Sequence, residues 1–220
     1  MFKIMKQTVA GIALLAMTSL SQAESEVSYS ANLGFMSDYM YRGIHQSSSS
    51  AMGGFDIEYG SFYVGTWFAD LQEGGWEAPG DDSHRGFEYD VYAGFGFDLT
   101  DSISASVGYT IYRYTDKGAS AFDDDYDEVN LGLGFAISED ASIAIDYAVG
   151  ENTATDQSET DYDVLTIAVD YLGMYALFGT WGVSEDDTSA GEVDADWMEF
   201  GYSRTVGDFD LSGAFVLSEK

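Results

Sequence analysis

The stretch FEYDVYAGFGFDL (residues 87–99) alternates between two kinds of side chain with a period of two. Every second residue from Phe87 to Leu99 is apolar or aromatic, whereas the residues between them are carboxylates, glycines and one tyrosine. Successive side chains of a β-strand point to opposite faces, so this pattern predicts a strand whose two faces meet different surroundings. The apolar face contacts either a protein core or lipid, and the rest of the sequence bears on that choice.

The same alternation recurs along the chain and predicts an all-β protein. No window has a helical period, and the only proline, Pro79, falls between predicted strands. The predicted strands cover residues 27–41, 51–59, 61–70, 87–99, 102–112, 129–138, 141–149, 162–172, 174–183, 196–204 and 208–217. Bacterial single-chain barrels have an even number of strands, so these eleven segments predict about 10–12 strands.

Short and long connections alternate between the predicted strands. The short turns are 59–61, 100–102, 138–141, 172–174 and 206–208, and the long joins are 70–86, 115–128, 150–161 and 184–195. Outer-membrane barrels have short periplasmic turns and longer extracellular loops.

A soluble β-sandwich would also alternate, with its apolar parity packed inward. The polar parity here is crowded with glycine and serine, which favours a confined barrel interior over a solvated face. Aromatic residues also recur toward strand ends on the apolar parity, as in the girdles of membrane barrels: Tyr41, Tyr109, Tyr147 and Tyr171. We therefore expect a transmembrane up-and-down antiparallel β-barrel with its apolar parity in lipid.

The beginning of the sequence predicts export. Lys3 and Lys6 precede the short apolar run TVAGIALLAMTSL, and the small-residue segment SQA follows it. This arrangement is typical of a secretory signal peptide, and the run is too short to span a bilayer as a helix. We expect a signal peptide at 1–23 and one barrel domain at 24–220, located in the outer membrane of a Gram-negative bacterium.

Composition excludes several classes of protein. The absence of cysteine excludes disulfide scaffolds and thiolate sites. A formal net charge of −31 excludes nucleic acid as a partner, because no basic patch is present to neutralise phosphates. The two histidines, His45 and His84, fall in or beside predicted loops, and the segment GDDSHRG (80–86) does not form a catalytic triad by adjacency. The sequence therefore predicts a protein that is not an enzyme and has no catalytic residues.

The region after the predicted signal peptide resembles a known family. The segments SANLGFMSDYMYRGIHQS (30–47) and GGFDIEYGSFYVGTWFADL (53–71) are similar to those of the TorF family of porins. The matching residues are Ser37, Asp38, Tyr39, Arg42, Gly43, Gln46, Gly54, Phe55, Asp56, Tyr63, Gly65, Thr66 and Trp67. The resemblance implies an outer-membrane barrel with a channel role.

If the apolar parity faces lipid, the carboxylates of the other parity face the lumen. The candidates for setting ion selectivity are Asp38, Arg42, Asp56, Glu58, Glu88, Asp90, Asp146 and Asp170. Asp98 and Asp210 share this parity, and Asp56, Asp90 and Asp146 are expected nearest the middle of the barrel. Rings of acidic side chains favour cations in a pore. The sequence therefore predicts a porin-like diffusion channel that prefers cations, and the alternative is a closed barrel that serves as a structural or adhesive surface protein.

Acidic loops complete the sequence predictions. The segments DDDYDE (123–128) and EVDAD (192–196) offer oxygen ligands suited to weak Ca²⁺ or Mg²⁺ binding, without the spacing of an EF-hand loop. We expect no tightly bound cofactor. The expected partners are outer-membrane lipid, lipopolysaccharide and small solutes or cations.

Overall fold

The structure is a computed structural model that describes residues 27–72, 85–115, 125–152, 160–183 and 196–218. The predicted signal peptide (1–23), His84, residues 123–124 of the first acidic segment and residues 192–195 of the second lie outside these residues.

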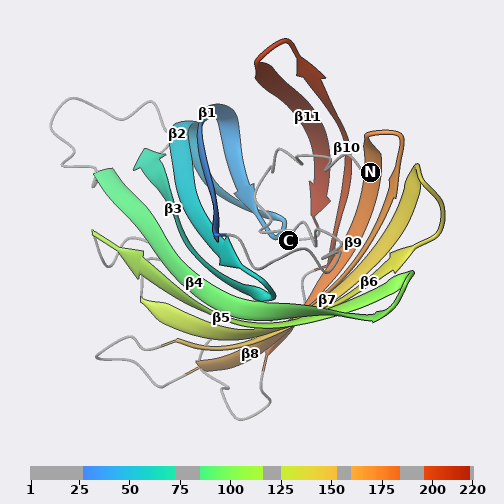
Figure 1. The fold of residues 1–220 in the computed structure, drawn as a ribbon. Coiled ribbons are helices and arrows are strands. Elements are labelled where there is room, and N and C mark those ends of the chain that lie inside the picture. Colours follow the sequence, from blue (N-terminus) through green and yellow to red (C-terminus); the bar gives the residue numbers. More distant parts are fainter. Residues whose placement is uncertain (1–26, 73–84, 116–124, 153–159, 184–195, 219–220) are drawn as a thin grey trace, which may run out of the picture.

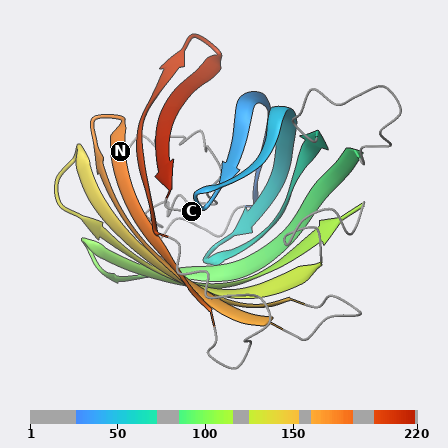
Figure 2. The same ribbon diagram turned by 180° about the vertical axis from the view of Figure 1, so that it is seen from behind.

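The described residues form eleven antiparallel strands in a single sheet, whose order follows the sequence from β1 to β11. The strands are β1 (Val27–Tyr41), β2 (Ile44–Tyr59), β3 (Phe62–Gln72), β4 (Arg85–Thr100), β5 (Ile103–Tyr114), β6 (Tyr126–Ala136), β7 (Ala141–Asn152), β8 (Thr160–Tyr171), β9 (Met174–Val183), β10 (Asp196–Val206) and β11 (Phe209–Ser218). The sheet curls into a nearly closed barrel with β1 and β11 at its two ends (Figures 1 and 2). The predicted all-β, up-and-down antiparallel barrel is confirmed.

The connections sort by barrel end, as predicted, with one exception. Tight turns join β2 to β3, β4 to β5, β6 to β7, β8 to β9 and β10 to β11 at one end, which we call the turn end. The opposite end, which we call the loop end, holds the strand ends that lead into segments 73–84, 116–124, 153–159 and 184–195. The exception is the two-residue turn Arg42–Gly43 between β1 and β2, which also belongs to the loop end.

Strand boundaries differ from the prediction where the apolar alternation stops before the strand does. β2 begins at Ile44 rather than at residue 51, because the segment HQSSSSA (45–51) pairs with β1 without presenting an apolar face. β6 begins at Tyr126 rather than at residue 129, and Glu128 is therefore a strand residue. A polar segment can form a strand when its backbone partners are already in place.

The two faces of the sheet differ as the period of two predicts. The large apolar side chains of the predicted lipid parity lie on the outside, and examples are Val91 (45% exposed), Leu133 (39%) and Tyr147 (38%). The opposite parity is buried inside the barrel and includes Glu88 (1% exposed), Glu128 (0%) and Glu199 (1%). In a protein surrounded by water the apolar residues would be the buried ones. None of the described residues belongs to a helix long and apolar enough to cross a membrane.

Candidate functional site

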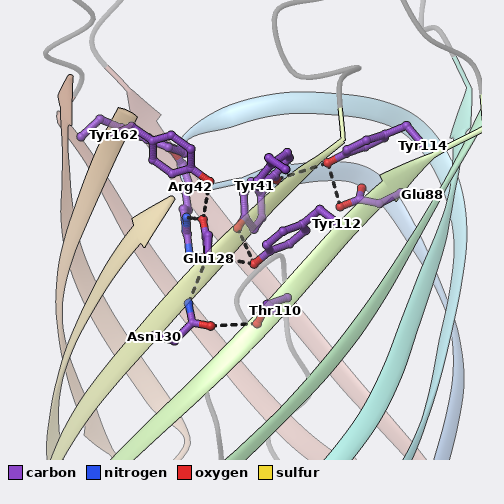
Figure 3. A network of polar contacts seen from close by, with 11 residues as sticks. Tyr41, Arg42, Glu88, Thr110, Tyr112, Tyr114, Glu128, Asn130 and Tyr162 are labelled. Atoms are coloured by element: carbon purple, nitrogen blue, oxygen red, sulfur yellow. Dashed lines mark hydrogen bonds and ion pairs between the residues drawn. The ribbon is translucent and has the colours of Figure 1, made fainter. Parts of the chain in front are cut away.

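The hairpin formed by β1 and β2 bends into the barrel at the loop end. In Figure 1 the end of β1 curls over and points toward the barrel interior, and Figure 3 shows Tyr41 and Arg42 inside the ring of strands. The pairing of β1 with β2 shifts register between Tyr39 and Met40, and such a bulge bends a strand and increases its twist. The turn residues Arg42 and Gly43 both have positive φ, 48° and 80°, as the tight hairpin turn requires.

The tip of this hairpin is held by an ion pair with the opposite wall. The guanidinium of Arg42 donates two parallel hydrogen bonds, at 2.5 and 2.9 Å, to the carboxylate oxygens of Glu128 on β6. Only 13% of the Arg42 side chain and none of the Glu128 side chain is exposed. Two-pronged contacts of this kind combine the strength of charged hydrogen bonds with a fixed geometry.

Three neutral donors from the wall orient the Glu128 carboxylate (Figure 3). The hydroxyl of Tyr162 donates to one oxygen at 2.8 Å. The hydroxyl of Tyr112 and the amide of Asn130 donate to the other oxygen, both at 3.1 Å. Asn130 in turn accepts a hydrogen bond from Thr110 at 2.8 Å. A buried charge is costly unless all of its lone pairs find partners, and this carboxylate has five donors.

An aromatic belt lines the interior around the ion pair. Tyr112 stacks on Tyr126 with ring centroids 4.3 Å apart, and the contacts continue through Tyr162, Trp181 and Trp197 at centroid distances of 6.1, 5.5 and 6.2 Å. These residues come from β5, β6, β8, β9 and β10. The belt therefore follows the inner wall over half of the sheet.

The belt also contacts the hairpin tip. The Cζ atom of Arg42 lies 5.5 Å from the ring centroid of Trp181 and 4.8 Å from that of Tyr41. The indole nitrogen of Trp181 donates a 2.9 Å hydrogen bond to the backbone carbonyl of Arg42. The hydroxyl of Tyr41 donates to that of Tyr112 at 3.0 Å. Electrostatic attraction between a cation and aromatic faces adds to the ion pair here.

Two of the predicted lumen carboxylates lie on β4 beside the hairpin. Glu88 is buried and has one oxygen 3.2 Å from the hydroxyl of Tyr114. Asp90 is buried as well, and its Oδ1 atom has no hydrogen-bond partner among the described residues. Both side chains share the inward parity that the sequence predicted.

The remaining candidates are spread along the barrel rather than gathered in one place. Asp56 accepts hydrogen bonds from Tyr92 at 2.5 Å and from Ser30 at 3.3 Å, and Glu58 accepts one from Ser28 at 3.4 Å. Asp146 and Asp170 are half-buried on the inward parity of β7 and β8. By contrast, 60% of the Asp38 side chain is exposed, next to His45, and Asp98 and Asp210 are exposed near the turn end.

Two tyrosines correct the predicted faces of β1. Tyr39 and Tyr41 were expected on the lipid parity, and Tyr41 in the outer aromatic girdle, but both are buried in the interior, with 1% and 8% exposed. The reason is the bend of the hairpin, which carries its tip into the barrel. Trp181 contacts the ion pair directly.

Sequence reasoning missed Glu128 as a site residue and assigned it to an acidic loop. The strand alternation extends back to it, because Tyr126 and Glu128 share the parity of Asn130 and Gly132. Asp127 interrupts the apolar parity and concealed this continuation. The carboxylate of Asp127 lies on the outer parity, where it accepts hydrogen bonds from Arg113 at 2.8 Å and from Tyr109 at 2.7 Å. Within the described ranges, no three histidine, cysteine or acidic side chains are placed to hold a metal ion.

The turn glycine of the hairpin provides a test of how tightly its tip is docked. A Cβ atom at Gly43 would lie 2.6 Å from the Cβ of Trp197, whereas one at Gly207, in the turn between β10 and β11, would meet nothing within 4 Å. Both glycines have positive φ. We expect Gly207→Ala to cost about 1 kcal/mol of unfolding free energy through backbone strain alone, and Gly43→Ala about 2–4 kcal/mol because overpacking is added. Urea unfolding followed by tryptophan fluorescence measures both, and equal losses would contradict the docked tip.

Comparison with known proteins identifies a family. Searches of curated proteins and of solved structures found no match to this chain. A family profile described as "Bacterial protein of unknown function (Gcw_chp)" matches residues 20–219, which is nearly the whole chain. The chain therefore belongs to the Gcw_chp family of bacterial proteins, whose function is unknown.

Proposed function

We propose that this protein is a porin-like channel of the outer membrane through which small solutes diffuse, with a preference for cations. It carries out no catalysis and needs no cofactor in this role. The resemblance of residues 30–71 to the TorF porins supports the same proposal.

The observation that carries the proposal is the distribution of side chains between the two faces of the barrel. The outer surface presents exposed leucine, valine, phenylalanine and tyrosine along its strands, whereas carboxylates, tyrosines and small residues face inward. A barrel with an apolar outer band and a polar interior suits a lipid bilayer. The signal peptide predicted at 1–23 agrees with export to that membrane.

The charges of the interior support cation preference. Buried or half-buried acids lie on the inward parity of several strands, namely Asp56, Glu88, Asp90, Glu128, Asp146, Asp170 and Glu199. Of the arginines whose side chains the structure describes, Arg42 points inward, whereas Arg113 and Arg204 share the outer parity. Low-dielectric walls focus such a negative field and favour cations over anions.

A closed barrel is the second candidate, and the hairpin tip favours it. Tyr39, Tyr41 and Arg42 occupy the interior at the loop end, and Tyr41 and Arg42 contact the opposite wall. Barrels of about eight strands are filled by their side chains, and those of sixteen or more enclose a channel. The eleven strands described here lie between these cases.

Reversal potentials of the refolded protein in a planar bilayer with asymmetric KCl test the proposal. We expect cation preference, which weakens when Asp56, Asp90 and Asp146 are all replaced by Asn. The matched control replaces Asp101, Asp140 and Asp208, which are exposed in turns at the turn end, by Asn and removes the same charge outside the lumen. Anion preference, or equal effects of the two triple variants, would refute cation selection by the lumen. Absence of any conductance would favour the closed barrel.

A further inference from the structure

The ion pair at the hairpin tip consists of a fixed part and a part carried by the hairpin. Glu128, Tyr112, Asn130, Tyr162 and Trp181 belong to β5, β6, β8 and β9, which pair with their neighbours along their length. We call these five residues the wall site. Arg42 belongs to a two-residue turn, and the strands that carry it pair only with each other and, through β2, with β3. The strand pairing that positions the wall site therefore does not depend on the hairpin.

We infer that the wall site is a binding site for the guanidinium group of a small organic solute, and that Arg42 is its tethered occupant. Without Arg42, Glu128 would keep three neutral donors but would be a buried carboxylate with no counter-charge. An uncompensated buried charge is strongly unfavourable, so the empty site takes up a cation that fits.

The geometry selects a guanidinium over other cations. Glu128 offers both of its oxygens side by side, at 2.5 and 2.9 Å from the two Arg42 nitrogens, and this fork matches a planar guanidinium. The ring of Trp181 lies 5.5 Å from the guanidinium carbon and provides an aromatic surface for a flat, weakly hydrated cation. A metal ion finds a single carboxylate here, since no group of metal ligands is present among the described residues. A compact ammonium would use one oxygen and leave the other without its charged partner.

The inference deepens the proposed function. Its consequence for transport rests on that proposed function, whereas binding at the wall site does not. If the barrel conducts, solutes that carry a guanidinium or amidinium group compete with Arg42 and displace the hairpin tip from the lumen. A tethered group acts at an effective concentration in the millimolar range. The wild-type protein therefore responds to a free guanidinium compound only at higher concentrations than a variant without Arg42.

Thermal unfolding of refolded Arg42→Ala during titration with methylguanidinium tests the binding site. Ligand that binds only the folded state raises the unfolding temperature, and the effect grows with concentration above the dissociation constant. We expect such a shift with methylguanidinium, and none with methylurea, its uncharged analogue, or with KCl at the same ionic strength. Arg42→Ala combined with Glu128→Gln should lose the response, and the wild type should need a higher concentration than Arg42→Ala.

A second variant covers the case in which Arg42→Ala does not fold. Arg42→Gln keeps a polar side chain at the tip, and we expect it to show the same dependence on methylguanidinium. The inference is overturned if neither variant responds, if methylurea or KCl acts equally, or if Glu128→Gln leaves the response unchanged. None of these measurements requires conduction. If the protein binds methylguanidinium but does not conduct in a bilayer, the channel is refuted and the binding site is retained. If it conducts but does not bind methylguanidinium, the binding site is refuted and the channel is retained.

Discussion

Arg42→Ala is expected to lower the free energy of unfolding by about 3–5 kcal/mol, because it leaves the carboxylate of Glu128 buried without its counter-charge. None of the Glu128 side chain is exposed, so water cannot replace the lost partner at low cost. The substitution also removes the contacts between the guanidinium and the rings of Tyr41 and Trp181. Urea unfolding in lipid vesicles, followed by tryptophan fluorescence, measures the loss.

Arg113→Ala is the matched control for this prediction. Arg113 forms a 2.8 Å contact with Asp127 between the neighbouring strands β5 and β6, but 29% and 26% of these two side chains are exposed. Partly exposed ion pairs contribute at most about 1 kcal/mol. Similar losses for the two arginines would mean that the hairpin tip is not docked in a dry interior.

The double variant Arg42→Met with Glu128→Gln separates the contribution of the charges to the free energy of unfolding from the contribution of side-chain packing. The Gln amide oxygen can accept from Tyr112 and Asn130, as Oε2 of Glu128 does, while its NH2 group can donate to the hydroxyl oxygen of Tyr162. Met keeps much of the Arg42 side chain volume. Replacing both partners of a buried pair with uncharged residues is often close to neutral. We expect the double variant to be more stable than Arg42→Ala.

The barrel wall could be predicted from the sequence because its faces meet such different surroundings. A one-residue error in register would move every carboxylate of residues 87–99 to the apolar outer face, so the alternation is strict and easily recognised. Strand ends were predicted less well. Near the loop end, Asp127 and the serines of residues 47–50 follow local pairing rather than the apolar pattern.

The inward course of the β1–β2 hairpin could not be predicted from local pattern. Tyr39 and Tyr41 continue the apolar parity of Leu33 and Phe35, and the bend that carries them into the barrel leaves no mark in the alternation. The partners that hold the tip lie 86 residues away at Glu128 and 139 residues away at Trp181. Only the curling of the sheet brings these residues together, so their role follows from tertiary structure.

The hairpin tip links the two candidate functions of the barrel. With Arg42 bound to Glu128 the loop end is occupied by the tip, and with the tip displaced the acidic inner wall becomes the surface that a solute meets. A ligand shifts an equilibrium between two such states only if it binds one state more tightly than the other. A guanidinium compound that binds the wall site supplies this difference, because it binds the displaced state alone.

The apolar outer surface, which we propose to face lipid, yields the second large effect, which depends on depth in the bilayer. Val91 lies near the middle of β4, and Leu99 lies on the same face at the turn end; the two residues are 45% and 56% exposed. The eight residue-to-residue steps from Val91 to Leu99 correspond to about 26 Å along the strand at ~3.3 Å per residue. Arginine on the lipid face of a barrel costs about 2–4 kcal/mol at the bilayer midplane and about 0–1 kcal/mol near the interface.

We therefore expect Val91→Arg to reduce folding stability in lipid vesicles by about 2–4 kcal/mol, and Leu99→Arg by no more than about 1 kcal/mol. The folded fraction can be measured by the heat-modifiable shift in gel mobility that membrane barrels show. A soluble barrel would tolerate both substitutions about equally, because water surrounds both exposed positions. Equal stability of the two variants in lipid would therefore refute the assignment of this face to the membrane. A large loss for Val91→Arg alone would place the middle of β4 in the hydrocarbon layer.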